Sequence, residues 1–180
     1  MALGATLYTV GVHLADVDRG VYEELDVRLA RHPSETAEFM VTRLLAYCLE
    51  YEPGIAFSDG GVSSTDEPAV LVRDLTGRIT AWIEIGAPDA DRVHRGSKLA
   101  GRVAIYTHRD PAKVLNQLSG KRIHRAEEIP LYGFDRAFVD DAAATLDRRN
   151  TLAVSVTERQ LYLTLNGVDL STLIEEHRLE

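Results

Sequence analysis

The stretch DEPAVLVRDLTGRITAWIEIG, residues 66–86, decides the fold of this chain. Two runs of apolar and β-branched residues, 69–73 and 79–86, flank a polar turn that contains Thr76-Gly77, and this pattern predicts a β-hairpin. Strand alternation places Trp82 and Glu84 on one face of the second run. Glu84 is then a carboxylate among apolar neighbours, and it needs a partner or a metal ion because burying an unpaired charge is costly.

The residues after the hairpin predict a crossover back to the same sheet. Residues 88–101 begin with Pro88-Asp89, where Asp89 is suited to cap a helix, and they carry Lys98 near the other end. Residues 102–107 are a short apolar run bounded by polar residues, as in a buried parallel strand. Strand, helix and strand across residues 79–107 therefore form a βαβ unit, which is normally right-handed.

A helix is predicted before the hairpin. It begins at His32-Pro33-Ser34-Glu35, where proline and early acids are favoured, and it continues to about Tyr51, before Pro53-Gly54. A helical wheel places Glu38 at the border of the apolar arc and Glu35 on the solvent side. Glu38 can thus face a site at the edge of the core, and a solvated surface carboxylate is the equal alternative.

The acids near the hairpin can be combined into one site. Metal-assisted phosphodiester hydrolysis needs carboxylates to hold the cation and a group such as a lysine to orient water or stabilise charge. Glu38, Asp66 and Glu84 supply the ligands of a Mg²⁺ or Mn²⁺ site, and Lys98 joins Asp66 and Glu84 as a catalytic residue. The hairpin register decides whether Asp66 or Glu67 shares the face of Glu84, and both remain open. The competing interpretation is a buried ion pair of Glu84 with Lys98 or an arginine, without a metal ion.

The remaining segments extend this mixed α/β core. Residues 3–14 and 21–30 predict an N-terminal hairpin, and residues 151–156 and 161–165 predict a closing hairpin. At 180 residues, the chain is most simply a single domain. We further expect a loop over 53–65, a helix over 110–118, a short strand within 123–129, a helix over 135–146 and a charged tail after Val168.

Composition narrows the partners and the compartment. The net charge of −8 and a pI near 5.3 give no overall attraction to nucleic acid, but residues 92–125 are locally basic, as expected if one face meets a phosphate backbone. Ordinary scattered surface charge is the competing interpretation. The single cysteine, Cys48, cannot form an internal disulfide, and we expect a buried thiol in a reducing compartment. No apolar stretch approaches the length of a membrane span, so we expect a cytoplasmic protein without a membrane partner.

Several motifs together carry a resemblance to a known family: Arg31-His32-Pro33-Ser34-Glu35-Thr36, Arg43-Leu44-Leu45-Ala46, Asp66-Glu67-Pro68 and Trp82-Ile83-Glu84-Ile85-Gly86. On these motifs the chain resembles the YaeQ family of bacterial proteins over nearly its whole length. That family is similar to a variant of the PD-(D/E)XK nuclease fold. The resemblance therefore implies a restriction-endonuclease-like mixed β-sheet flanked by helices, with the two terminal hairpins added to it.

The same resemblance implies a role for each acid. Glu38 corresponds to the first-helix acid, Asp66 to the aspartate of the first motif and Glu84 to the acid of the second motif. The usual pattern has a lysine two residues after that acid, where this chain has Gly86. The resemblance implies that Lys98, on the following helix, reaches back in its place.

Two functions follow as expectations. The first is a divalent-metal-dependent nuclease or phosphodiesterase that acts on nucleic acid, motivated by the acids and the basic segment. The second is a non-catalytic protein that keeps the nuclease-like fold as a nucleic-acid or protein binding module. Gly86 in the place of the lysine and the net charge of −8 support the second.

Overall fold

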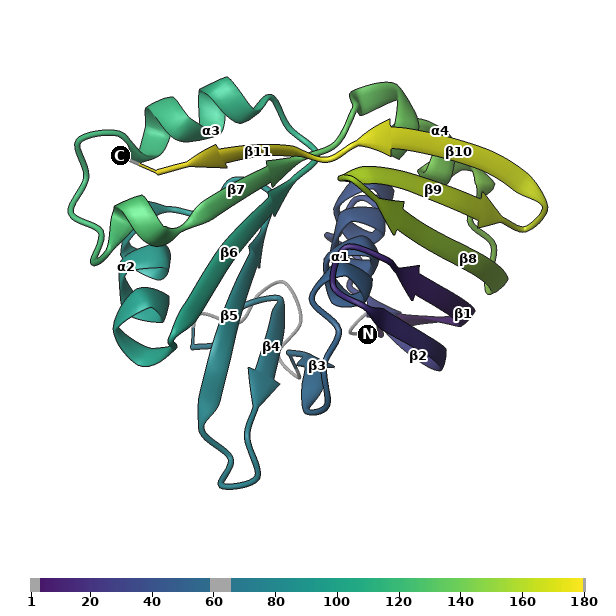
Figure 1. Ribbon diagram of the computed structural model, residues 1–180, viewed down its shortest axis with the longest axis horizontal. Helices are drawn as coiled ribbons and strands as arrows, with labels where there is room; N and C mark the ends of the chain where they lie inside the picture. The colour runs from purple at the N-terminus through teal and green to yellow at the C-terminus, as the bar shows by residue number, and fades with distance from the viewer. Residues whose placement is uncertain (1–3, 59–65, 180) are drawn as a thin grey trace.

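The computed structural model describes residues 4–58 and 66–179. These residues form two mixed β-sheets and four α-helices, with one helix between the sheets (Figure 1). We call the sheet with strand order β10-β9-β8-β1-β2 sheet A, and the sheet with order β11-β7-β6-β5-β4-β3 sheet B. The loop predicted over 53–65 is wrong at residues 55–57, which form the strand β3, and its residues 59–65 lie outside the described ranges.

Sheet A is built from the two predicted terminal hairpins. β1 pairs antiparallel with β2, β8 pairs antiparallel with β9, and a parallel pairing of β1 with β8 joins the hairpins into one sheet. The predicted tail after Val168 is wrong, because residues 168–173 add a further strand, β10, to β9. The strands of sheet A are β1 Thr6–Asp16, β2 Val21–Arg31, β8 Arg149–Thr157, β9 Gln160–Leu165 and β10 Val168–Leu173.

Sheet B contains the predicted hairpin and crossover. β4 and β5 pair antiparallel, and the helix α2, Ala90–Leu99, leads to β6, which is parallel to β5. The short strand expected within 123–129 is wrong: residues 126–128 form a 3₁₀ turn, and the strand follows it as β7. The strands of sheet B are β3 Ile55–Phe57, β4 Val70–Arg73, β5 Ile79–Ile85, β6 Arg102–Thr107, β7 Pro130–Gly133 and β11 Glu175–Arg178.

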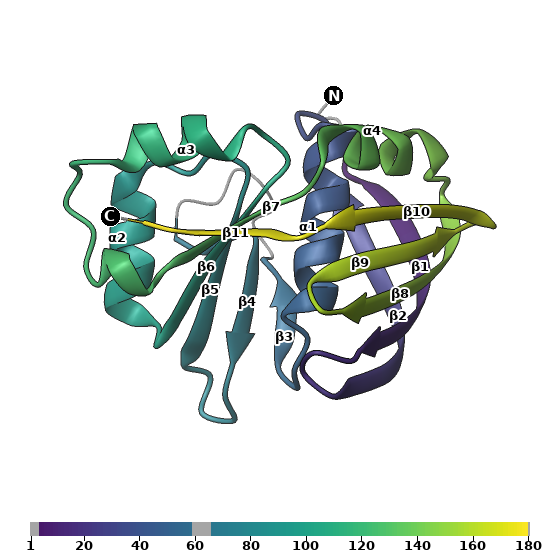
Figure 2. The same ribbon diagram turned by 45° about the horizontal axis from the view of Figure 1, so that its top comes forward.

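The helix α1, Ala37–Leu49, lies between the two sheets, and its buried residues share one apolar core with both (Figures 1 and 2). It begins after Thr36, whose hydroxyl accepts the N–H of Phe39, rather than at the predicted His32-Pro33-Ser34-Glu35. α4, Arg136–Thr145, packs against α1 and β10. A second core, around Trp82, fills the other face of sheet B beneath α2 and α3, Pro111–Leu118.

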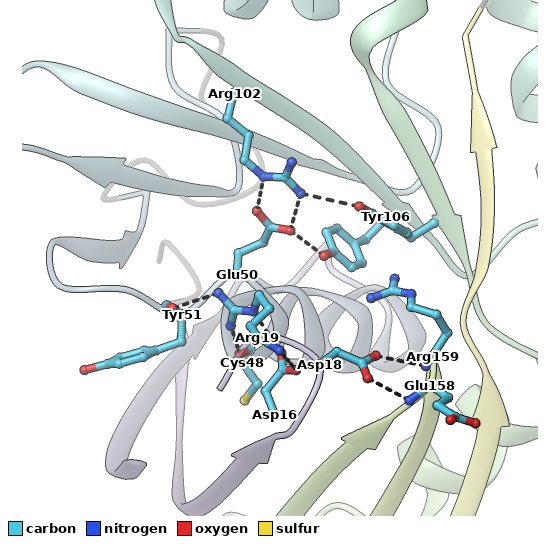
Figure 3. A network of polar contacts seen from close by, with 11 residues as sticks. Asp16, Asp18, Arg19, Cys48, Glu50, Tyr51, Arg102, Tyr106, Glu158 and Arg159 are labelled. Carbon is cyan, nitrogen blue, oxygen red and sulfur yellow. Dashed lines mark hydrogen bonds and ion pairs between the residues drawn. The ribbon is translucent and has the colours of Figure 1, made fainter. Parts of the chain in front are cut away.

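A polar network ties the C-terminal end of α1 to both sheets (Figure 3). From sheet B, Arg102 donates to the two carboxylate oxygens of Glu50 at 2.7 and 2.8 Å, and the Tyr106 hydroxyl donates to Glu50 at 2.5 Å. From the β1–β2 turn, Arg19 bonds Asp16 and donates to the Tyr51 carbonyl at 3.1 Å. Arg19 also donates to the Cys48 carbonyl in the last turn of α1 at 3.5 Å, and its positive charge suits the negative end of the helix dipole.

Candidate functional site

A cleft lies where the parallel strands β5 and β6 end and the helices that follow them begin. Its volume is about 460 Å³, and its walls come from α1, the end of β5, the start of α2 and α3. The crevice outside the carboxyl ends of parallel strands is the usual ligand site of open α/β sheets. The lining residues are Phe39, Ala69, Glu84, Ile85, Gly86, Ala87, Pro88, Arg92, Arg109 and Gln117.

Glu84 is the buried carboxylate of this cleft, with 3% of its surface exposed. Its Oε2 accepts hydrogen bonds from the Trp82 indole N–H at 2.8 Å and from Arg92 Nε at 3.1 Å, and its Oε1 accepts from Arg92 Nη2 at 3.3 Å. Burial raises the pKa of Glu84, and the charge of Arg92 opposes that rise. Both oxygens are thus already held by donors of this chain.

The local fold explains why Arg92 is the partner of Glu84. Alternation along β5 turns Trp82 and Glu84 toward α2, and the predicted cap Asp89 accepts the Arg92 N–H at 2.9 Å and starts the helix beside Glu84. The other residue of this face, Trp82, packs against Gly96, where a Cβ would lie 2.5 Å from the indole ring. Gly96 therefore allows α2 to approach the sheet closely enough for the ion pair to form.

The pairing of β4 with β5 ends at Val70 opposite Ile83, and Asp66 and Glu67 lie in bends before β4, so the strand register assigns neither acid to the face of Glu84. The Glu67 carbonyl accepts Arg92 Nη2 at 2.9 Å. The Glu67 carboxylate instead accepts Arg73 Nη2 at 2.6 Å and the Ser58 hydroxyl at 3.1 Å.

The other predicted site residues lie around or beyond the cleft. Asp66 is exposed, and Glu38 is half-buried in the first turn of α1. Lys98 is exposed in the last turn of α2, about 9 Å along the helix axis from Arg92 at the usual rise per residue. Within residues 4–58 and 66–179, no group of three or more histidine, cysteine, aspartate and glutamate side chains is arranged to hold a metal ion.

Gly86, which stands in the place of the usual lysine, has a positive φ of 84°. A Cβ there would meet the Phe39 ring at 3.5 Å and His108 Cε1 at 3.7 Å, so aromatic rings flank the position. Burial lowers the pKa of His108, and the nearby Glu38 opposes that shift. Backbone conformation thus favours glycine here, since only glycine adopts positive φ without strain.

A second buried ion pair was missed by the sequence reasoning. Glu35, placed on the solvent side by the helical wheel, is only 4% exposed and accepts Arg43 Nε at 2.9 Å and Nη2 at 3.1 Å. The prediction for Glu35 is wrong because the residue precedes the cap Thr36, so helical periodicity does not apply to it. Arg43 also lies over the Phe57 ring, 4.9 Å from its centroid.

The locally basic segment 92–125 is divided between internal and exposed charges. Arg92 and Arg102 bind the buried acids Glu84 and Glu50, and Arg125 donates to carbonyls at the end of α2. Other cations of the segment are exposed on α2, on the cleft wall, on α3 and on the loop after it: Arg95, Lys98, Arg109, Lys113, Lys121 and Arg122. No helix in the described part of the chain is long and apolar enough to cross a membrane.

Comparison with known proteins places this geometry in a family. The model of the YaeQ protein family matches residues 1–173. The YaeQ protein of Escherichia coli (strain K12) is 32% identical over 165 residues, which cover 91% of each chain. The crystal structure of the YaeQ protein from Pseudomonas syringae has a TM-score of 0.85 at 30% identity, over 98% of this chain and 97% of that one. The YaeQ structure from Xanthomonas axonopodis pv. citri, with a TM-score of 0.83 at 23% identity over 98% and 99%, shares the fold.

Proposed function

Because this chain belongs to the YaeQ family, we propose a function for it from the cleft of that shared fold: the protein binds the phosphodiester backbone of nucleic acid there and does not hydrolyse it. The observation that carries the proposal is the arginine-held Glu84 in the cleft. Arg92 neutralises the one buried acid of the lining, and the exposed Arg109 then supplies positive charge on the wall. A phosphate group is attracted to the cleft because Glu84 is neutralised by Arg92 and Arg109 adds a positive charge.

The arrangement of sheet B supports a nuclease-like origin for this site. A helix, a hairpin and a strand-helix-strand crossover form the core of PD-(D/E)XK enzymes, and α1, β4–β5 and β5–α2–β6 have that order here. We therefore propose that the fold is a variant of that superfamily. The buried, unpaired Cys48, whose pKa is raised to about 12 by burial, agrees with a cytoplasmic protein.

Salt-dependent binding tests the proposal. Labelled single-stranded and duplex oligonucleotides are titrated with the protein between about 50 and 200 mM salt, where phosphate contacts dominate the change in affinity. Arg109→Ala should weaken binding to every sequence and lower the salt slope by about one. Arg149→Ala, an exposed arginine on sheet A, is the matched control and should bind as the unmodified protein does. Absence of binding at the lowest salt would refute the proposal.

Metal-dependent hydrolysis is the second candidate, favoured by the buried Glu84 with Glu38 on the helix across the cleft. As they lie, the residues do not fit a Mg²⁺ or Mn²⁺ ion, because the Arg92 guanidinium already supplies the counter-charge of Glu84 and, among the described residues, no three acidic, histidine or cysteine side chains are grouped to hold a cation. The same oligonucleotides incubated with Mn²⁺ and run on a denaturing gel distinguish the candidates. Cleavage that is lost in Asp66→Ala/Glu84→Ala would establish a nuclease and overturn the non-catalytic proposal.

A further inference from the structure

The outer edge of β2 has backbone groups that point away from sheet A. Thr9 and Val17 of β1 donate their N–H groups to β8, at Arg148 and Val156, both at 2.9 Å. Backbone groups alternate in direction along a strand, so the residues of β1 that bond β8 do not bond β2. The β2 residues opposite them therefore direct their N–H and C=O groups away from sheet A. These residues are Tyr22, Glu24, Asp26, Arg28 and Ala30.

This edge is long and open over most of its length. β2 is the last strand of sheet A, and Figure 1 shows it at the end of the sheet. Of its outward carbonyls, Ala30 accepts Arg43 Nη2 at 3.1 Å. An unpaired edge strand is a template for another strand, and proteins usually blunt such edges with charged side chains, proline or a bulge, so the arrangement of the charges on β2 decides whether a second strand can pair with it.

The charges on β2 are divided between its two halves. Glu23, Glu24 and Asp26 stand before Val27, whereas Arg28 and Arg31 stand after it. An antiparallel copy of the same strand, centred on Val27, would therefore meet opposite charges. In that register Asp26 lies opposite Arg28 of the second copy, and Glu23 lies opposite Arg31 of the second copy. A shift by two residues toward the N-terminus would instead place Glu24 opposite Asp26, which are like charges.

A groove lies beside the second half of β2, where the first half of another copy would pair. It has a volume of about 510 Å³ between β2 and the edge strand β3 of the other sheet. Arg28 and His32 are basic residues of its lining, Arg43 is already paired with Glu35, and Tyr47 and Phe57 are stacked aromatic residues with ring centroids 4.7 Å apart. This lining complements the acidic first half of β2 and the exposed ring of Tyr22.

We propose that β2 pairs antiparallel with β2 of a second copy of this chain, centred on Val27, so that the two A sheets form one continuous sheet across a two-fold axis. The outward residues then exchange backbone hydrogen bonds in pairs, as Asp26 does with Arg28 of the second copy. Self-complementarity of this kind is what an isologous interface requires, since one strand supplies both partners.

Charge reversal tests the register. Sedimentation velocity across micromolar to millimolar concentration should show a monomer–dimer equilibrium for the unmodified protein. Arg28→Glu and Asp26→Arg each place like charges opposite one another twice per dimer, and each should raise the dissociation constant by about tenfold. The double variant Asp26→Arg/Arg28→Glu restores opposite charges and should restore the dimer.

Two further variants distinguish pairing through this edge from association through another surface. Asp26→Pro removes an outward N–H, which costs the monomer no ladder bond but blocks pairing, so it should be monomeric with unchanged circular dichroism. Arg149→Glu, exposed on the same sheet, should leave the equilibrium unchanged. A protein that is monomeric at all concentrations, or a dimer that survives Asp26→Pro and both single charge reversals, would overturn the proposal.

Discussion

Removing Arg92 should destabilise the protein in a way that depends on pH. The Glu84 side chain is 5% exposed and that of Arg92 is 23% exposed, so Arg92→Leu leaves a carboxylate buried without its counter-charge. Breaking a buried pair from one side costs about 3–5 kcal/mol, and the partial exposure of Arg92 favours the lower end, about 3 kcal/mol at neutral pH. The hydrogen bond from Arg92 to the Glu67 carbonyl is lost as well.

The pH dependence has a definite sign. The pKa of Glu84 is raised in the folded protein by burial, and losing Arg92 removes a charge that lowers it, so the pKa rises further in the variant. The folded state then binds the proton more tightly than the unfolded state does. The Glu84 carboxyl therefore contributes its full stabilisation at pH values below its ordinary pKa in the unfolded state. This contribution is lost as the pH rises through the raised pKa of the folded state. The deficit of Arg92→Leu should therefore shrink as the pH falls from neutral.

Urea denaturation at several pH values and constant ionic strength measures this effect. The double variant Arg92→Leu/Glu84→Gln carries no buried charge at this site. The difference between its free energy of unfolding and that of the unmodified protein should therefore not become smaller at low pH, whereas for Arg92→Leu it does. If Arg92→Leu loses the same free energy at every pH, and the double variant loses it too, the destabilisation comes from packing. The buried charge would then play no part in it.

Four further outcomes are expected from the surroundings and the backbone conformation of individual residues. Gly96→Ala should destabilise the protein by about 1–3 kcal/mol in chemical denaturation, because its Cβ would lie 2.5 Å from the Trp82 ring and overpack the second core, although alanine favours helices. Gly101→Ala, with nothing within 4 Å of the new Cβ, should change stability by less than about 1 kcal/mol in the same assay. Gly86→Ala should cost about 1–2 kcal/mol through its positive φ of 84°, which would be seen as a lower urea midpoint. Cys48, with a pKa raised to about 12, should resist a thiol reagent at mildly alkaline pH until the protein is unfolded, and rapid labelling of the native protein would contradict this.

Local chemistry explains which elements the sequence predicted. The hairpin of residues 66–86 and the helices capped by Asp89 and Asp110 depend on periodicity and on caps, both visible within a short window. The last hairpin was also visible in principle, since Asn166-Gly167, both with positive φ, is a strong turn signal before β10. The charged residues after this turn hide the alternating pattern by which the strands β10 and β11 would be predicted.

Long-range pairing explains what the sequence did not predict. The two terminal hairpins were expected as additions to the core, but the parallel pairing of β1 with β8 joins residues about 140 positions apart, as the bond from Thr9 to Arg148 shows. No local pattern specifies such a partner. For the site, the sequence identified Glu84 and Lys98 and allowed an arginine as the partner of Glu84, yet the choice of Arg92 follows from topology. A helix that returns antiparallel to β5 begins beside the end of that strand, so its first turn meets Glu84 and its last turn does not.

The proposed dimer and the proposed cleft lie on different sheets, and this arrangement separates their effects. β2 is the outer edge of sheet A, whereas Glu84, Arg92 and Arg109 belong to the end of sheet B, with α1 between the sheets. Loss of the dimer should therefore leave the affinity of one cleft for a short oligonucleotide unchanged. A strand long enough to reach both clefts of a dimer gains affinity through effective concentration. Asp26→Pro should thus weaken binding of long strands alone, and equal weakening for short ones would mean that the β2 edge itself contacts nucleic acid.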